Sequence, residues 1–187
     1  MIISLSGAHG SGKSTIAQKL ADTLSWPRYY MGGLRREAAA RRGLSLTEYN
    51  LLGEKDAATD QEVDEYQKNL GLTQDNFIIE GRTSWYFIPH SLKIYLDVDE
   101  DEGAQRIFGH LQEKNERNEG DGLESVEAVK ASLRQRLASD NLRYQKYYGI
   151  EVYDQAHYDF YLNTTNLSPE ESFEQVYAFV RSRLDKS

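Results

Sequence analysis

Short apolar runs alternate along the chain with longer stretches in which apolar residues recur at helical spacing. The first run, MIISLS at residues 1–6, is continuous and ends at a glycine, which is typical of a parallel strand buried on both faces. Four later runs predict further strands, at residues 28–33, 76–82, 91–98 and 158–165. The stretch after the first run has a helical period, with apolar residues at Ile16, Ala17, Leu20, Ala21 and Leu24. Strands that alternate with helices predict an α/β fold with a parallel sheet.

Two helix starts carry the residues of a capping box. One is SLTE at residues 45–48 and the other is SPEE at residues 168–171, where Pro169 takes the first helical position. The second box opens a final helix with one apolar face, formed by Phe173, Val176, Tyr177 and Val180.

Residues 110–125 differ from the rest of the chain. They almost lack apolar side chains and include Gly120 and Gly122, so they predict an irregular excursion from the domain. Two interpretations remain open, a solvated loop and a lid that closes over a substrate.

Length and charge narrow the class of protein. With 187 residues, the chain predicts a single domain that spans residues 1–187. The net charge of −8 argues against a nucleic acid or an anionic membrane as partner, because both attract basic surfaces. A small phosphorylated ligand remains compatible, since a local group of arginines can oppose the overall sign.

The absence of cysteine from the sequence excludes disulfides and thiolate zinc sites. No apolar run approaches the roughly 18 residues of a membrane span, and the first residues lack the basic region of a signal peptide. We therefore expect a cytoplasmic protein.

The stretch GAHGSGKST at residues 7–15 has the spacing of a phosphate-binding loop, and it lies between a predicted strand and a predicted helix. Backbone N–H groups of such a loop surround the β-phosphate of a nucleotide, and Lys13 reaches the β- and γ-phosphates. The Ser14 hydroxyl completes the coordination of Mg²⁺. The predicted nucleotide-binding residues are Gly7, Ala8, His9, Gly10, Ser11, Gly12, Lys13, Ser14 and Thr15. His9 is expected to be a neutral spectator in this loop.

Two charged residues follow the third predicted strand. Glu80 lies at its carboxyl end and Arg82 lies just beyond, at the sheet edge where α/β proteins bind ligands. Glu80 is a candidate ligand for Mg²⁺, and Arg82 is a candidate clamp for the phosphate of an acceptor. A capping carboxylate and a surface ion pair are the alternatives. Asp97 and Asp99 compete for the metal, but their position favours capping the next helix.

Other polar and aromatic clusters favour structural roles. Arg35, Arg41 and Arg42 form a short basic helix face that we expect to be solvated. The four histidines lack metal-ligand spacing. We interpret the tyrosines near the C-terminus as packing residues, namely Tyr144, Tyr147, Tyr148, Tyr153, Tyr158 and Tyr161.

Beyond the loop, the chain resembles the nucleoside monophosphate kinases, most closely the short cytidylate kinases of the archaeal type. The resemblance extends through most of the chain and is more specific than a phosphate loop alone. It rests on MIISLSGAHGSGKST, GGLRREAAARRGLSLTEY, TDQEVDEYQ, FIIEGRTSW, RYQKYYGIEVYD and YDFYLNTTNLSPEE.

This resemblance implies transfer of the ATP γ-phosphoryl group, with Mg²⁺, to CMP or dCMP. It implies a three-layer P-loop kinase fold whose parallel five-stranded sheet has the order 2-3-1-4-5. A helical insert near residues 33–72 would bind the monophosphate, and a lid would lie near residues 108–143. Nucleotides would be the only partners of a monomeric enzyme.

The resemblance also implies roles for individual residues. Arg36 and Arg82 would bind the acceptor phosphate, and Asp64 would lie near the base. Arg106 would lie against the adenine of ATP. Arg136 and Arg143 would reach in from the lid, so the predicted catalytic residues are Lys13, Arg82, Arg136 and Arg143. Arginines, a lysine and Mg²⁺ are sufficient for phosphoryl transfer because the acceptor phosphate is already an anionic nucleophile.

The chain departs from the family pattern at four positions. Gly33 replaces an aspartate, His110 and Asn141 replace arginines, and Leu137 replaces an acidic residue expected to meet the cytosine amino group. Arg117 and Arg134 are candidate substitutes for the missing arginines. These departures leave two alternatives open. One is a P-loop kinase for another small acceptor, and the other is a nucleotide-binding regulatory module with little transferase activity.

Overall fold

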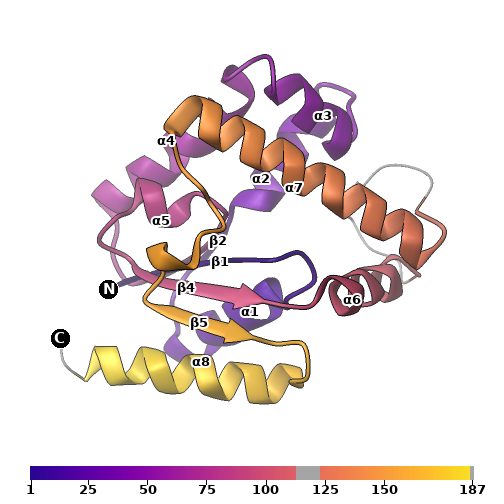
Figure 1. Cartoon of the computed structure of the whole chain (residues 1–187). Coiled ribbons are helices and arrows are strands. Elements are labelled where there is room, and N and C mark those ends of the chain that lie inside the picture. The colour runs from indigo at the N-terminus through magenta and orange to yellow at the C-terminus, as the bar shows by residue number, and fades with distance from the viewer. Residues whose placement is uncertain (113–122, 186–187) are drawn as a thin grey trace.

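The computed structural model describes residues 1–112 and 123–185. Within these residues, a sheet of five parallel strands has the order β2-β3-β1-β4-β5 (Figure 1). The strands are β1 (Ile2–Gly7), β2 (Arg28–Tyr30), β3 (Phe77–Glu80), β4 (Leu92–Asp97) and β5 (Phe160–Asn163). The predicted α/β class and strand order are confirmed, and each of the five predicted runs overlaps one of these strands.

The second strand is shorter than the sequence predicts. It ends at Tyr30, and helix α2 (Met31–Arg41) begins at the next residue, so the predicted strand at residues 31–33 is wrong. The Tyr30 ring folds back over the start of this helix. A Cβ atom at Gly32 would lie 2.7 Å from the ring, and one at Gly33 would lie 2.9 Å from it. Glycine at these positions therefore makes room for the ring.

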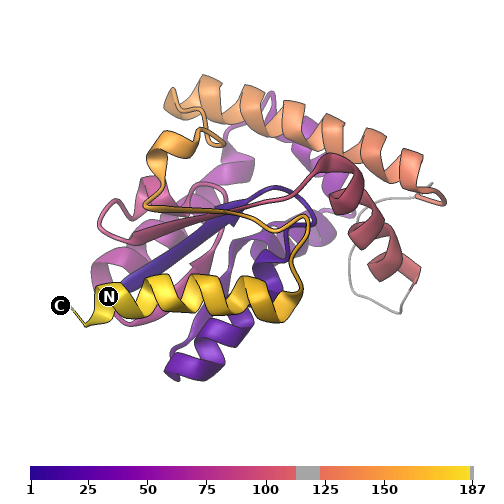
Figure 2. The same ribbon diagram turned by 60° about the horizontal axis from the view of Figure 1, so that its bottom comes forward.

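Helices cover both faces of the sheet (Figures 1 and 2). Helices α1 (Lys13–Leu24) and α8 (Pro169–Leu184) pack on one face, where Ile3, Leu5 and Ile78 contribute to the core. The neighbouring strand residues Ile2, Phe77 and Ile79 point to the other face. There they meet α2 and α4 (Ala58–Thr73), with α5 (Ser84–Phe87) alongside. The sheet is thus the middle of three layers, as expected for strands that are apolar on both sides.

A long helix, α7 (Val126–Tyr148), begins near α6 (Glu100–Gln112) beyond the carboxyl ends of the strands and runs back above the sheet in the view of Figure 1. At one end it packs against α6 through Ala104, Ile107, Val129 and Leu133. At the other end it contacts α3 (Leu46–Gly53), where the Tyr147 hydroxyl donates to the carbonyl oxygen of Gly53 at 2.7 Å. A short 3₁₀ helix (Gln155–His157) follows α7. Most of the predicted excursion, residues 113–122, lies outside the described residues.

Both predicted capping boxes are confirmed. The Ser45 and Ser168 side chains accept from the backbone N–H groups of Glu48 and Glu171, whose carboxylates accept in return from the backbone of the serines. Pro169 begins α8 as expected. In the described part of the chain, no helix has the length and apolar character that crossing a membrane requires.

The phosphate loop approaches its neighbours so closely that two of its glycines are required. A Cβ atom at Gly7 would lie 1.9 Å from the carbonyl oxygen of Leu96, and one at Gly10 would lie 2.3 Å from that of Gly103. Both residues also have a positive φ, which glycine adopts at little cost. The loop is therefore fixed against the ends of β4 and α6.

Substituting Gly10 by alanine should destabilise the protein more than substituting Gly12. The two residues have φ near +80°, but a Cβ atom at Gly12 would meet nothing within 4 Å. Gly12→Ala should lower the free energy of unfolding by about 1–2 kcal/mol, the cost of a left-handed backbone. Gly10→Ala should lower it by a further ~1–3 kcal/mol from overpacking. Urea unfolding followed by circular dichroism measures both, and equal losses would contradict the close packing at Gly10.

Candidate active site

A cleft with a cavity volume of about 530 Å³ lies at the carboxyl edge of the sheet. Its walls come from the phosphate loop, α2, α4, the segment after β3, α6 and α7. Most of the predicted site residues line it together, namely residues 9–15, Arg36, Asp64, Glu80, Arg82, Arg106 and Arg136. Gly7, Ala8 and Arg143 do not line it. The sequence therefore located the cleft, although it placed Arg143 wrongly.

The loop at residues 9–15 forms one end of the cleft, where helix α1 begins. The Lys13 ammonium group donates to the carbonyl oxygen of Ala8 at 2.5 Å, and the Ser11 hydroxyl donates to the same oxygen at 2.9 Å. Lys13 thus lies across the loop it belongs to. The N-terminal N–H groups of a helix and an adjacent lysine form an anion-binding site suited to phosphate.

Ser14 and Glu80 are in direct contact beside this loop. The Ser14 hydroxyl donates to one oxygen of the buried Glu80 carboxylate at 2.5 Å. Arg28 donates to the other oxygen at 2.7 Å and also contacts Gln18. A hydroxyl and a carboxylate are ligands that suit Mg²⁺, which usually takes one or two protein ligands together with phosphate oxygens. The donor set therefore fits this ion, and Arg28 is a partner that the sequence did not indicate.

The two competing aspartates have other partners. The backbone N–H of Asp101 donates to Asp99 at 2.9 Å, which is the expected capping contact. Asp97 accepts from the Tyr161 hydroxyl at 2.5 Å and does not line the cleft. Over residues 1–112 and 123–185, no group of three or more His, Asp or Glu side chains is placed to hold a metal.

Arginines gather at the other end of the cleft. Arg82 contacts Asp140 at 2.7 Å through its Nε atom, and the same atom donates to the Tyr153 hydroxyl at 2.9 Å. Arg36 donates to the Tyr30 hydroxyl and to the carbonyl oxygen of Gly32. Arg136 lines the cleft from α7. This group of arginines is the local positive region that the acidic chain needs to attract an anion.

His9 is not the spectator that the sequence suggested. Its Nε2 atom lies 2.5 Å from an Nη atom of Arg82. Burial, followed by the charges of Arg136, Arg82, Lys13 and Arg36, holds the pKa of His9 well below its usual value. A neutral imidazole can accept a hydrogen bond from Arg82, so the phosphate loop contributes directly to the position of this guanidinium.

Asp64 lies on the α4 wall among polar neighbours. Its carboxylate accepts from the Tyr148 hydroxyl and from Gln67, whose side chain is held in turn by Thr83 and Ser84. Burial raises the pKa of Asp64 to about 6, although the hydrogen bond from Tyr148 opposes the shift. The group is therefore ionised at pH 7 but close to its titration range.

Arg106 joins the loop to the segment after β5. It pairs with Glu102 at 2.8 Å and donates to the carbonyl oxygens of Thr164 and Thr165 at 2.9 and 3.1 Å. It also lies 3.5 Å from the carbonyl oxygen of Gly10. Arg106 lines the cleft beside the phosphate loop, which is compatible with its predicted place near the base of a donor nucleotide.

Two predicted arginine positions need correction. Arg143 is fully buried and pairs with Asp60 and Asp140, so it does not reach into the cleft. Arg35, expected to be solvated, is buried and lines the cleft, where it pairs with Asp60 at 2.5 Å. A basic helix face can turn inward when another helix presents a carboxylate, and a single helix does not reveal that partner.

The candidate substitute arginines do not reach the cleft in the described residues. Arg134 lies on the exposed side of α7 and pairs with Glu100 at 2.5 Å. Arg117 lies outside the described residues. His110 lines the cleft, whereas Leu137 and Asn141 are exposed and do not.

Sequence analysis missed the polar roles of several residues. Tyr148 and Tyr153 were interpreted as packing residues, yet their hydroxyls bind Asp64 and Arg82. Asp60 and Asp140 were not singled out. The spacing of Asp140 and Arg143 on a predicted helix was the available signal, because residues three apart lie on the same face.

Comparison with known proteins shows a likeness over most of the chain. A sequence model described as the cytidylate kinase-like family matches residues 2–166. The chain is 34% identical over 172 residues to a cytidylate kinase of Natronomonas pharaonis, covering 91% of this chain and 84% of that protein. It is 32% identical over 170 residues to a cytidylate kinase of Methanobrevibacter smithii, covering 91% of this chain and 92% of that protein.

A solved structure has a similar fold. The shikimate kinase of Bacteroides thetaiotaomicron superposes with a TM-score of 0.64 and 16% sequence identity, covering 97% of this chain and 98% of that chain. At this level of identity the likeness concerns the fold alone.

Asp64 should make the stability of the protein depend on pH. The pKa of Asp64 is raised to about 6 in the folded state, so protonation of this carboxyl group stabilises the fold. This contribution to the free energy of unfolding is fully present below about pH 4. It is lost as the pH rises through about 6. Between pH 5 and pH 8 the wild type should lose about 1.4 kcal/mol of unfolding free energy that Asp64→Asn does not lose. Urea unfolding at both pH values measures this difference.

Glu62→Gln is a suitable control because it removes an exposed carboxylate from the same helix. This variant should retain the pH dependence of the wild type. If Asp64→Asn also retained it, the raised pKa would be wrong.

Proposed function

Because the chain belongs to the cytidylate kinase-like family, we propose that it transfers the γ-phosphoryl group of ATP to a nucleoside monophosphate, with CMP or dCMP as the acceptor. One observation carries this proposal. A single cleft joins a phosphate loop with its Ser14–Glu80 pair at one end to a group of arginines and Asp64 at the other. This arrangement suits two anionic substrates that meet in the middle.

The donor nucleotide binds at the loop end. The N–H groups of residues 10–15 surround the β-phosphate, and Lys13 leaves its contact with Ala8 to reach the β- and γ-phosphates. Arg106 lies beside the adenine. Ser14 and Glu80 would hold Mg²⁺, and the ion when bound would offset the negative charge of the phosphates.

The acceptor phosphate binds to Arg36, Arg82 and Arg136. One of its oxygens attacks the γ-phosphorus, the bond to the β–γ bridging oxygen breaks, and ADP leaves as the diphosphate product forms. No protein base is needed because the attacking oxygen is already anionic. The arginines and Lys13 align the two phosphates and stabilise the charge that is spread over the transferring group.

Asp64 favours a base that carries an amino group. An ionised carboxylate accepts from the exocyclic amine of cytosine, whereas the corresponding oxygen of uracil would face it with repulsion. Tyr148 and Gln67 fix the orientation of this carboxylate. Asp64 thus supplies the preference for cytosine that would otherwise come from the acidic residue that Leu137 replaces.

We also propose a division of the domain into a core and two substrate-binding parts. The helical insert near residues 33–72 contains α2, α3 and the cleft-facing part of α4. The lid near residues 108–143 contains the end of α6 and most of α7, and its residues 113–122 lie outside the described part of the chain.

A coupled assay of ADP release tests the proposed activity. With ATP and Mg²⁺, CMP or dCMP should stimulate ADP release strongly over a sample without acceptor. Lys13→Ala should lower kcat by at least about 100-fold, the typical effect of removing one charge-stabilising donor. Lys19→Ala is the matched control, because it removes the same side chain from the outer side of the same helix, where Lys19 pairs with Glu170.

Two results would count against the proposal. ADP release stimulated only by a small acceptor that is not a nucleotide would indicate a different kinase. Binding of ATP without turnover by any acceptor would indicate a regulatory module.

Asp64→Asn should reduce the preference for CMP over UMP. Its amide retains the shape of the carboxylate but also presents a donor, which can meet the uracil oxygen. The ratio of kcat/KM for CMP to that for UMP should fall by about tenfold or more, because one hydrogen bond to a charged group contributes about 1.5–3 kcal/mol. The ratio should be measured at pH 8, where Asp64 is ionised. An unchanged ratio would place the base elsewhere.

A further inference from the structure

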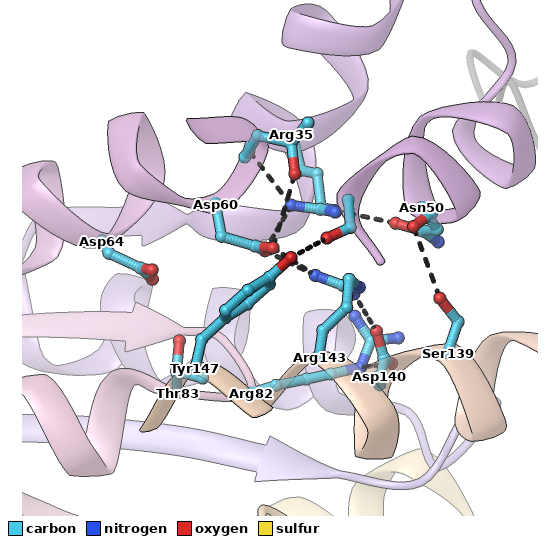
Figure 3. Close-up of polar contacts among 12 residues, drawn as sticks. Arg35, Asn50, Asp60, Asp64, Arg82, Thr83, Ser139, Asp140, Arg143 and Tyr147 are labelled. Carbon is cyan, nitrogen blue, oxygen red and sulfur yellow. Dashed lines mark hydrogen bonds and ion pairs between the residues drawn. The ribbon is translucent and has the colours of Figure 1, made fainter. Parts of the chain in front are cut away.

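Asp140 lies between Arg82 and Arg143 in a chain of ion pairs (Figure 3). The side chain is 1% exposed, and each of its carboxylate oxygens contacts a different guanidinium group. One oxygen accepts from Arg143 at 2.5 Å, and the other lies 2.7 Å from the Nε atom of Arg82. Asp140 does not line the cleft, whereas Arg82 does. Asp140 can therefore act on the substrates through Arg82, which it contacts directly and which lines the cleft.

Arg82 is held at two of its three nitrogen atoms. The Nε atom contacts Asp140 and the Tyr153 hydroxyl, and Nη2 contacts His9. Nη1 has no hydrogen bond to the part of the chain that the structure describes. Asp140, Tyr153 and His9 thus fix the guanidinium through Nε and Nη2, and Nη1 remains for a ligand in the cleft. An arginine that is fixed in this way loses little conformational freedom when it binds a phosphate.

A carboxylate beside a phosphate-binding arginine would normally weaken the attraction for an anion. Here a second arginine offsets it, because Arg143 pairs with Asp140 and also with Asp60, which pairs with Arg35 (Figure 3). Three arginines and two aspartates leave one positive charge in this cluster. Burial alone would raise the pKa of Asp140, but Arg82, Arg143, Arg136 and Arg35 hold it below the usual value. The carboxylate therefore remains ionised and oriented.

We infer that Asp140 is a positioning residue for the acceptor phosphate, because its buried carboxylate fixes the guanidinium of Arg82 while Arg143 balances its charge. The inference rests on the proposed function for the identity of the acceptor. Arg143 then has a role other than contact with the transferring phosphate. Its positive charge balances the Asp140 carboxylate, so Asp140 can hold Arg82 without cancelling the charge of Arg82.

A double-mutant cycle between Asp140 and Arg82 tests the inference. Asp140→Asn retains the shape of the side chain and removes its charge. It should lower kcat/KM for CMP by about 100-fold, because displacing a positioning group by about 1 Å has an effect of this size. The loss should come mainly from a higher KM for CMP. The KM for ATP should change by less than about twofold. In an Arg82→Ala background, the same change should alter kcat/KM by less than about threefold. Asp140→Glu should restore part of the loss.

Ser139→Ala is the matched control. Ser139 is the buried neighbour on α7, contacts the backbone of Asn50 and does not line the cleft. This variant should keep wild-type kinetics. Equal losses from Asp140→Asn in both backgrounds, or equal changes in KM for ATP and for CMP, would overturn the inference.

If Asp140→Asn does not fold, Tyr153→Phe tests the positioning role of Asp140 instead. It removes a hydrogen bond to both Asp140 and Arg82 without leaving a buried charge unpaired. The rise in KM for CMP should be smaller, about three- to tenfold, and should again disappear in the Arg82→Ala background. A rise that persists in that background would overturn the inference.

A measurement without nucleotide separates this inference from the proposed function. The Nε–H signal of Arg82 in a nitrogen–proton correlation spectrum, assigned by its absence in Arg82→Ala, should be sharp and slow to exchange in the wild type. In Asp140→Asn it should shift and exchange rapidly. An unchanged signal would overturn the positioning role, whereas a changed signal in a protein that does not phosphorylate CMP would contradict only the proposed acceptor.

Discussion

The structure depends on one constraint, which is that a site for two anionic substrates must hold several arginines close together. Guanidinium groups that are partly removed from water repel one another and lose hydration, so they remain folded together only when carboxylates lie between them. Asp60 and Asp140 meet this need from different helices, one on α4 and one on α7. Their ion pairs cross the boundary between the acceptor-binding helices and α7. The same ion pairs therefore hold the arginines of the site together and pack these helices against one another.

The loop end of the cleft is determined by contact between backbones rather than by charge. Gly7 and Gly10 allow the phosphate loop to touch β4 and α6, and residues 9–15 then line the cleft. His9 connects this rigid end to Arg82 at the other. In the proposed function, this hydrogen bond connects the donor end of the cleft with its acceptor end, and it would help to set the distance that in-line transfer requires.

Local patterns in the sequence were sufficient for the individual elements and the α/β class, whereas the order of the strands was predicted from the resemblance to a known family. The continuous apolar runs, the two capping boxes and the loop spacing each identify an element without reference to any other part of the chain. The sequence also located the cleft, since Glu80 and Arg82 follow a strand whose carboxyl end must lie at the ligand edge. It failed where a residue's role depends on a distant partner. The burial of Arg35 requires Asp60, the position of Arg143 requires Asp60 and Asp140, and the Tyr153 hydroxyl matters only beside Arg82.

The Tyr30 ring has a consequence for how this chain can have diverged from its relatives. It occupies the space above Gly33, the position at which the family pattern has an aspartate, and it also accepts a hydrogen bond from Arg36. A larger side chain at position 33 would have to displace the ring, and removing the ring would leave Arg36 without this contact. The effect of a substitution at position 33 should therefore depend on which residue occupies position 30. The two positions are coupled through one ring.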